Sequence, residues 1–505
     1  MRAANMSYYQ KLTERFQQIY RLDHAITYLN WDQMVMMPAN GNDARAQAIA
    51  ELASVRHGFL TAPEVSDWFD EIESGGEVQQ VSQKAMLREM RRKWADAHCL
   101  PSALIKARVV AGSRCEHGWR QQRPNNDWTG FLANFKAVVD LSREEANHRL
   151  EVSNGRLASP YEALLDLYCT GDNLSLVESV FAALRQELPQ LLQQAQDQQA
   201  SSQQTVTGDF PIAEQHAINE KLMQCLGFDF ESGRLDQSIH PFSTGVAGDL
   251  RITTRYRTTD FLEALNATAH ETGHASYEGG LPEEWKGLPL GGHRNMCIHE
   301  SQSLLFEKQV FLSRAFCRYF TPVIHQTMPA SSSFNADALW TANTRVIPGY
   351  IRVEADEVSY PLHVLLRYEI ERELINGQIE AKDIPELWND RMQDYLGLST
   401  AGNFTEGCLQ DIHWTDGGFG YFPSYTLGAV NAAQIFSTIK KAHPNWQDDL
   451  EKGDVSFIRQ WLSDKIWQKG CLLESQELMQ FATGEESNPQ HYLEHLRARY
   501  IDRLY

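Results

Sequence analysis

The sequence predicts a mainly α-helical protein, built as one large helical domain with a small β-sheet inserted near the middle of the chain. The first observation is helical periodicity: Leu12, Phe16, Ile19 and the apolar residues that follow step by three or four positions along one stripe. The second is the recurrence of residue patterns that begin and end helices. The third is a hydrophobic content of 42% with 10% aromatic residues, which supplies enough apolar surface for a large core.

Capping residues place several helix boundaries in the first part of the chain. Ser7 followed by Gln10 forms a capping box at the start of a first helix, and the segment 38–41 (Pro-Ala-Asn-Gly) ends that region. The segment 74–76 (Ser-Gly-Gly) separates the helices that follow. The segment 159–162 (Ser-Pro-Tyr-Glu) combines an N-cap, a proline at the first helical position and a glutamate at the third, so it predicts another helix start.

The middle of the chain departs from this helical pattern. A glutamine-rich stretch over 186–204 is expected to be the solvated end of a helix followed by a surface turn at 200–202. Glycine, proline, threonine and serine then gather over 228–256, and the segment 251–256 is rich in β-branched residues, which predicts a small sheet there. Helical patterning resumes after Asp260, a suitable N-cap.

Charge and composition exclude several classes of protein. The chain has 46 lysine and arginine residues against 66 aspartate and glutamate residues, a formal net charge of −20. This charge argues against a nucleic-acid partner and against binding to anionic membranes. Eight cysteines without a C-x-x-C pair argue against a disulfide scaffold and favour a reducing compartment. Without a secretory signal pattern or a bilayer-spanning apolar run, the sequence predicts a soluble cytoplasmic protein.

The predicted helix after Asp260 contains the pattern H-E-x-x-H at 270–274. His270 and His274 lie one turn apart on the same helix face, so that both imidazoles can bind one metal ion. Glu271 lies beside that face, where it can take a proton from the attacking water without binding the metal. A chance occurrence of the pattern among 17 histidines is the alternative.

A catalytic metal needs a third protein ligand. Glycine at 277 and histidine at 280 would indicate a metzincin, but the chain has Tyr277 and Gly280. The remaining option is a carboxylate from a following helix, and Glu300, in the segment 299–302 (His-Glu-Ser-Gln) that opens an apolar helix, is the candidate. On spacing alone, an ordinary surface glutamate is the alternative.

Neither an internal repeat nor a linker-like segment divides the chain. We therefore expect a single domain over residues 1–505, with an N-terminal helical half (1–205) and a zinc-site half (206–505).

Several motifs in fixed order show a resemblance that covers nearly the whole chain. They are Trp31-Asp32 with Met37-Pro38, His240-Pro241-Phe242, Asp249-x-Arg251-x-Thr253, the H-E-x-x-H segment, His299-Glu300-Ser301-Gln302, Ile351-Arg352-x-x-Ala355-Asp356 and Gly407-x-x-Gln410-Asp411-x-His413-Trp414. With these motifs the chain resembles the Taq-type thermostable zinc metallocarboxypeptidases, and it departs from the pattern at none of these positions.

The resemblance implies a neurolysin-like helical fold with a deep active-site groove, commonly assembled as a homodimer. It implies one zinc ion per chain, held by His270, His274 and Glu300, with cobalt as a possible substitute and with Glu271 as general base and acid. It further implies that the substrates are peptides, that single residues are removed from their C-termini, that specificity is broad, and that action on proline is poor.

A carboxypeptidase needs a cation that binds the free C-terminal carboxylate, and arginine is suited to bind it with two hydrogen bonds. Arg352 is our choice, with Asp356 expected to orient it; a structural Arg–Asp pair on one helix is the alternative. Arg251, paired with Asp249 on the expected β-edge, is the second candidate, and a scaffold role explains it equally well.

Other polar residues could stabilise the developing oxyanion or line the site. His413, Tyr421 and Tyr425 lie on or beside a glycine-rich stretch, and His240 lies next to a proline; a structural role is the alternative for each. The zinc-binding histidines also need partners for their other ring nitrogens, for which Asp249, Asp356 and Asp411 are the candidates.

Two rival functions remain at this point. An endopeptidase or dipeptidase on the same fold would share every zinc residue and lack only the arginine that binds the carboxylate. A catalytically silent helical scaffold that binds peptides is the rival from another class, and Glu271 argues against it because a binding module has no use for a base beside the metal.

Overall fold

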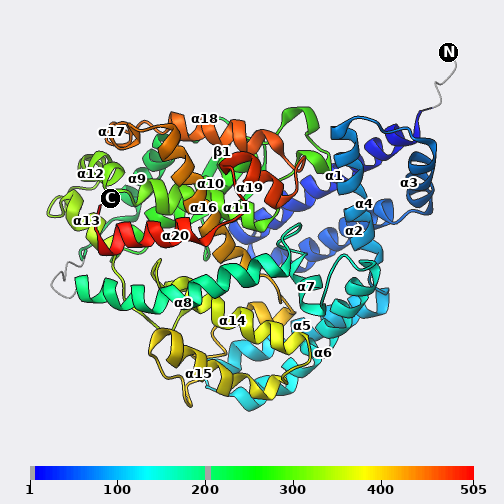
Figure 1. The fold of residues 1–505 in the computed structure, drawn as a ribbon, viewed down its shortest axis with the longest axis horizontal. Coiled ribbons are helices and arrows are strands. Elements are labelled where there is room, and N and C mark those ends of the chain that lie inside the picture. Colours follow the sequence, from blue (N-terminus) through cyan, green and yellow to red (C-terminus); the bar gives the residue numbers. More distant parts are fainter. Residues whose placement is uncertain (1–5, 200–205, 505) are drawn as a thin grey trace.

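The structure is a computed structural model that describes residues 6–199 and 206–504 (Figure 1). The first nine helices are α1 (Tyr8–Val35), α2 (Asn42–Leu60), α3 (Pro63–Gly75), α4 (Val81–His98), α5 (Ser102–Gln122), α6 (Trp128–Val152), α7 (Pro160–Leu165), α8 (Leu174–Gln199) and α9 (Ile212–Cys225). Three strands follow: β1 (Gly233–Gln237), β2 (Phe242–Val246) and β3 (Asp249–Thr254).

The remaining helices complete the fold after the strands. They are α10 (Leu262–Gly279), α11 (Met296–Leu304), α12 (Arg314–Thr327), α13 (Ala336–Asn343), α14 (Tyr360–Ile375), α15 (Ile384–Leu396), α16 (Pro423–Ala442), α17 (Trp446–Leu450), α18 (Ser456–Lys465), α19 (Ser475–Thr483) and α20 (Pro489–Leu496). Two π-helical segments, Leu305–Phe311 and Arg497–Ile501, directly continue α11 and α20.

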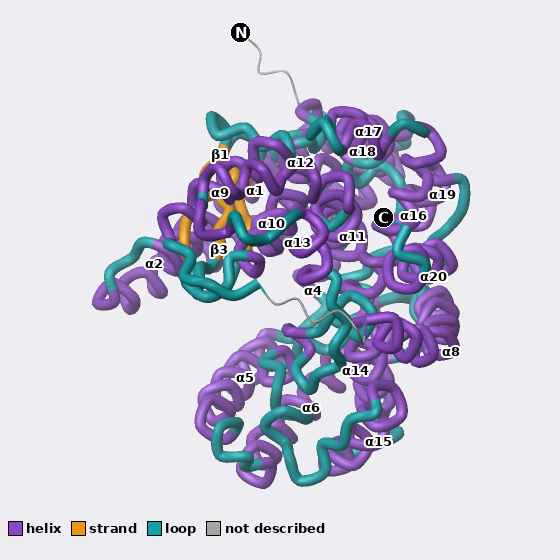
Figure 2. The backbone as a smooth tube through the Cα atoms, turned by 90° about the vertical axis from the view of Figure 1, so that its left-hand side faces the viewer, coloured by secondary structure: helices purple, strands orange, loops and turns teal. Residues whose placement is uncertain are grey.

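The helices form two bodies that share α16, because residues of this helix belong to both of the larger apolar clusters. Figures 1 and 2 show α5, α6, α14 and α15 gathered at one end, while the sheet, α10, α11 and α16 lie at the other. Each body has its own apolar cluster, and a third, smaller cluster joins α1, α3 and α4. The expectation of a single domain over 1–505 stays a prediction.

The small sheet has the strand order β1-β3-β2, with β1 parallel and β2 antiparallel to β3. The buried Ile252 of β3 faces Leu235 of β1 and joins Leu250 and Ala275 in a cluster that seats the sheet on α10. The sheet therefore holds the helix that carries the H-E-x-x-H segment.

Most of the expected boundaries are confirmed. Ser7 and Gln10 form the capping box of α1, Ser159 caps α7, and Asp260 Oδ1 accepts hydrogen bonds from the backbone N–H groups at the start of α10. The helix expected to open at 299 begins earlier, at Met296, because Asn295 caps it by accepting from the Ile298 N–H. The surface turn expected at 200–202 lies outside the described residues.

Two further expectations can be compared with the structure. The eight cysteines, all within the described ranges, are free thiols. Among the described helices, none is long and apolar enough to cross a membrane.

One feature of the body that contains α5, α6, α14 and α15 bears on stability. Glu371 of α14 is fully buried and accepts hydrogen bonds from Trp414 Nε1 (2.6 Å), the Gly420 N–H (3.0 Å) and the Tyr161 hydroxyl (3.2 Å). Burial raises the pKa of Glu371 to about 7 from 4.5, against the lowering effect of these donors.

Helix α10 approaches α11 closely because Gly273 has no side chain. A Cβ atom added to Gly273 would lie 2.6 Å from both the Gln302 carbonyl oxygen and the Ser303 Cα. The two backbones are therefore in direct contact at this point, which places the histidines of α10 opposite the acidic residue of α11.

Candidate metal centre and active site

Three predicted metal ligands meet where α10 packs on α11. His270 Nε2 lies 3.7 Å and His274 Nε2 lies 3.4 Å from Glu300 Oε2, and the three ligand atoms lie within 4.8 Å of one another. His274 and Glu300 are buried, and His270 is half-buried. Two imidazoles and one carboxylate converging on one point are the donor set of a catalytic zinc site, so these residues fit the metal that the sequence predicts.

A glycine on α16 makes room for the acidic ligand. A Cβ atom added to Gly428 would lie 2.6 Å from Glu300 Cγ and 2.7 Å from its Cβ. The side chain of Glu300 thus packs directly on the backbone of α16, and this contact fixes the direction in which its carboxylate points.

The partner of His270 is Glu307, which the sequence analysis missed. Glu307 Oε2 lies 2.9 Å from His270 Nδ1, and Lys308 Nζ lies 2.6 Å from Glu307 Oε1. Burial would raise the pKa of Glu307, but the charges of Lys308 and His270 lower it to about 2. The position of Glu307, two turns after Glu300, is the sequence signal that could have found it.

The three aspartates expected in this role serve elsewhere. Asp249 pairs with Arg251, Asp356 accepts hydrogen bonds from the Ser359 N–H and hydroxyl at the start of α14, and Asp411 binds two arginines. That part of the prediction is wrong, since Glu307 occupies the position next to His270 Nδ1.

Glu271 is buried beside the proposed ligands, and its side chain interacts with Ser243 of β2. Burial raises the pKa of Glu271 to about 7, against the lowering effect of the charge on His270. A carboxyl group whose pKa lies near neutrality can both accept and release a proton at physiological pH.

Arg352 belongs to a buried cluster that contains two arginines and one aspartate. Its Nη2 donates to Asp411 Oδ1 (2.8 Å), and its Nη1 donates to the Tyr360 hydroxyl (2.7 Å). Arg367, fully buried, donates from Nε to Asp411 Oδ2 (2.6 Å). Asp356 therefore does not orient Arg352, as the sequence analysis expected, because residues 352–354 form a separate short turn before α14.

The predicted aromatic and histidine residues gather around this cluster. The guanidinium of Arg352 lies 5.4 Å from the ring centre of Tyr425, whose ring meets that of Tyr421 edge-on at 5.2 Å. Tyr421 stacks on His413, with the ring centres 5.5 Å apart. Burial raises the pKa of Tyr425, and the nearby charge of Glu300 raises it further, so its hydroxyl keeps its proton at neutral pH.

Arg251 and His240 lie apart from this cluster. The guanidinium of Arg251 pairs with Asp249 and stacks over Trp31 of α1 at 4.5 Å. His240 is exposed in the loop between β1 and β2, and neither residue lines the cavity next to Glu300.

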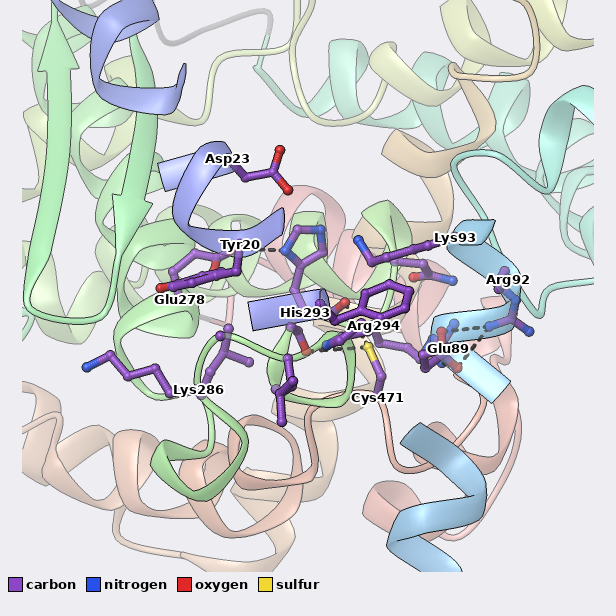
Figure 3. A pocket seen from close by; sticks show the side chains of 18 of the residues that line it. Tyr20, Asp23, Glu89, Arg92, Lys93, Glu278, Lys286, His293, Arg294 and Cys471 are labelled. Atoms are coloured by element: carbon purple, nitrogen blue, oxygen red, sulfur yellow. Dashed lines mark hydrogen bonds and ion pairs between the residues drawn. The ribbon is translucent and has the colours of Figure 1, made fainter. Parts of the chain in front are cut away.

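Two cavities lie in this region, and the smaller one is lined by a proposed metal ligand, Glu300. The smaller, about 210 Å³, is bounded by Glu300, Glu307, Tyr360 and Tyr425. The larger, about 530 Å³, lies between α1, α4 and the segment 281–296, and Figure 3 shows the charged side chains on its wall.

Comparison with known proteins agrees with this geometry. The family model of the carboxypeptidase Taq (M32) metallopeptidases matches residues 11–500. Thermostable carboxypeptidase 1 of Thermus thermophilus is 34% identical over 478 residues, covering 93% of this chain and 94% of its own. Carboxypeptidase 1 of Bacillus subtilis is 32% identical over 493 residues, covering 96% and 97%. The structure of Trypanosoma cruzi metallocarboxypeptidase 1 superposes with a TM-score of 0.94 at 40% identity, covering 98% and 99%.

Fold and site together define a metallopeptidase. Within that class, the chain belongs to the carboxypeptidase Taq (M32) metallopeptidase family. It is a hydrolase that acts on peptide bonds, its substrates are peptides, and a metal ion is expected in it. The predicted family and the mainly α fold with a small sheet are confirmed.

Proposed function

We propose that this chain is a zinc carboxypeptidase that removes single residues from the C-termini of peptides. One zinc ion per chain is held by His270, His274 and Glu300, and cobalt is a possible substitute. The observation that carries the proposal is the buried Arg352, whose guanidinium is suited to bind a carboxylate. It lies 5.4 Å from the ring centre of Tyr425, and Tyr425 lines the same cavity as Glu300.

The charge of the arginine cluster favours an anionic ligand. Asp411 is a single carboxylate that accepts hydrogen bonds from both Arg352 and Arg367, so the buried cluster carries one more positive charge than negative. Burial would raise the pKa of Asp411, but the two guanidinium groups hold it well below its usual range, so it stays ionised. A C-terminal carboxylate bound at Arg352 would neutralise the remaining charge.

The catalytic roles follow from the positions of the side chains. When bound, zinc supplies a Lewis acid that polarises the peptide carbonyl and lowers the pKa of water. Glu271 takes the proton from the attacking water and passes it to the leaving amino group, as its pKa near neutrality allows. Tyr421, Tyr425 and His413 are the donors proposed for the oxyanion. Tyr425 lines the cavity beside Glu300, the ring of Tyr421 packs on that of Tyr425, and the ring of His413 packs on that of Tyr421.

The smaller cavity supports broad specificity. A side chain of the C-terminal residue would enter the 210 Å³ space beside Glu300. Its wall combines apolar residues, among them Leu304, Val353 and Pro361, with charged residues such as Lys308 and Glu357. Apolar and polar side chains can therefore both make contacts there. We also propose, from the family resemblance, that a C-terminal proline is removed poorly.

The decisive test compares a peptide with a free C-terminus and its amidated twin. In wild type we expect the amidated peptide to lose about 2–5 kcal/mol of transition-state binding, roughly thirty-fold to several-thousand-fold in kcat/KM. Arg352→Ala should erase most of this discrimination while metal content stays unchanged. Arg352→Lys should restore it only in part, since a point charge cannot replace the guanidinium fork.

Arg251→Ala is the matched control, because Arg251 was the second candidate and its contacts are with Asp249 and Trp31. This variant should discriminate as well as wild type does. If wild type instead cuts both peptides at one rate, the endopeptidase or dipeptidase alternative takes the place of this proposal. Metal and peptide binding without turnover would favour the silent scaffold.

We propose in addition that the enzyme is a cytoplasmic homodimer. The homodimer rests on the family resemblance, and the location rests on the cysteine usage. Sedimentation of the purified chain at several concentrations tests the dimer, and cell fractionation tests the location.

A further inference from the structure

The face of α10 that carries the two predicted metal-binding histidines continues for one more turn. Glu278 follows His270 and His274 at the same interval of four residues, so that all three side chains leave α10 on one face. Beyond the helix, two more histidines approach Glu278: His293 from the segment after α10 and His299 from α11.

These side chains converge on a single oxygen atom. His293 Nδ1 lies 2.7 Å and His299 Nε2 lies 2.9 Å from Glu278 Oε1. One ligand atom from each of the three residues lies within 4.8 Å of the others. The cluster thus repeats the donor set of the first site, two imidazoles and one carboxylate, without sharing a residue with it.

The cluster is open to water on one side. Glu278 and His293 line the 530 Å³ cavity, where Figure 3 draws the hydrogen bond between them. Water molecules in the cavity could therefore complete the coordination of an ion. On the other side, the ring of His299 stacks on that of His274 with the centres 4.4 Å apart, so the two clusters are neighbours along α10.

We propose that Glu278, His293 and His299 form a second site for a divalent transition metal, Zn²⁺ or Co²⁺, next to the first. Imidazole and carboxylate together suit these ions, whereas Mg²⁺ and Ca²⁺ prefer oxygen ligands alone. Each imidazole would bind the ion through the ring nitrogen that faces Glu278, so its single proton would lie on its other ring nitrogen.

The second site binds its ion more weakly than the first. In the first site, Glu307 holds His270 Nδ1 in place. In the second, His299 Nδ1 has no hydrogen-bond partner within the described part of the chain, and the side chain of His293 is 42% exposed. Loss of such supporting hydrogen bonds typically weakens metal binding ten- to hundred-fold, and we expect this difference between the sites.

The test counts metal ions and does not depend on activity, so it can fail independently of the proposed carboxypeptidase function. Metal-free full-length protein is titrated with Zn²⁺ by calorimetry in the presence of a competing chelator, and with Co²⁺ by visible absorption. Wild type should bind two equivalents per chain, with dissociation constants about ten- to hundred-fold apart. A single equivalent in wild type would overturn the proposal.

Two variants assign the second equivalent. His293→Ala and Glu278→Gln should each keep the tighter equivalent and lose the weaker one, and His274→Ala should lose the tighter one. His443→Ala is the matched control: His443 Nε2 lies 2.7 Å from Asp449 Oδ2 in a similarly exposed pair, which has no third ligand among the described residues, so both equivalents should remain. A weaker equivalent that persists in both His293→Ala and Glu278→Gln, with circular dichroism showing a folded chain, would refute the assignment.

Discussion

Gly428→Ala tests the role of Glu300 without touching any proposed ligand. The new Cβ would lie 2.6 Å from Glu300 Cγ, 2.7 Å from its Cβ and 3.2 Å from its backbone carbon. Carbon atoms in contact prefer a separation of about 3.5–4.0 Å, so Glu300 or α16 has to move by about 1 Å. Metal–ligand distances tolerate only about 0.2 Å, so a shift of this size removes the carboxylate from the coordination shell.

We expect two measurable results from this variant. The affinity for zinc, measured by competition with a coloured chelator, should fall at least tenfold, as it does when a ligand loses its support. The unfolding free energy of the metal-free protein should fall by about 1–3 kcal/mol, the usual effect of one extra carbon in a packed core.

Gly58→Ala provides the matched control. Gly58 lies within α2, and a Cβ added there meets no atom within 4 Å. This variant should keep the wild-type zinc affinity. Its free energy of unfolding should rise by about 0.5–1 kcal/mol, because alanine is a better helix former than glycine. If Gly428→Ala loses stability yet binds zinc as wild type does, Glu300 is not a ligand and the reasoning is refuted.

Three further predictions concern acidic residues. Glu271→Gln should lower kcat by about a hundred- to ten-thousand-fold with zinc content unchanged, and loss of the metal would instead identify Glu271 as a ligand. Glu307→Gln should weaken zinc binding about ten- to hundred-fold by chelator competition, because the amide cannot hold the imidazole of His270 as the carboxylate does; equal affinity would contradict this. Glu371 should make the protein less stable as pH rises: its pKa is about 7 when folded and 4.5 when unfolded, so the folded chain holds a proton that the unfolded chain loses between these values. Between pH 5 and pH 8, the free energy of unfolding measured in urea should fall by about 2.5 kcal/mol more in wild type than in Glu371→Gln. Parallel declines in the two proteins would refute the assignment.

The sequence predicted those parts of the structure that depend on neighbours along the chain. The capping residues Ser7 and Ser159 begin helices as expected, and the sheet occupies the segment where β-branched residues gather. The pair His270 and His274 could be predicted in the same way, because a spacing of four on a helix fixes the relative position of two side chains.

Contacts between distant segments could not be derived by that route. Arg352 pairs with Asp411, 59 positions away, whereas the sequence analysis chose Asp356 because it assumed one helix through both residues. Local spacing carries no information about which loop packs on which. The same limit explains why a structural role stayed open for both Arg352, the first choice, and Arg251, the second, until their surroundings were visible.

The π-helical segment Leu305–Phe311 makes the site sensitive to insertions and deletions. An α-helix advances roughly 100° per residue, and a π-turn accommodates one residue more than an α-turn does. Deletion of Leu305 or Phe306 would allow regular α geometry, yet it would move Glu307 one position back and turn it away from His270. A shortened segment would therefore keep a continuous helix and leave the metal-binding histidine without its partner. We therefore expect the number of residues between Glu300 and Glu307 to be constant among relatives of this chain, even where the lengths of their loops differ.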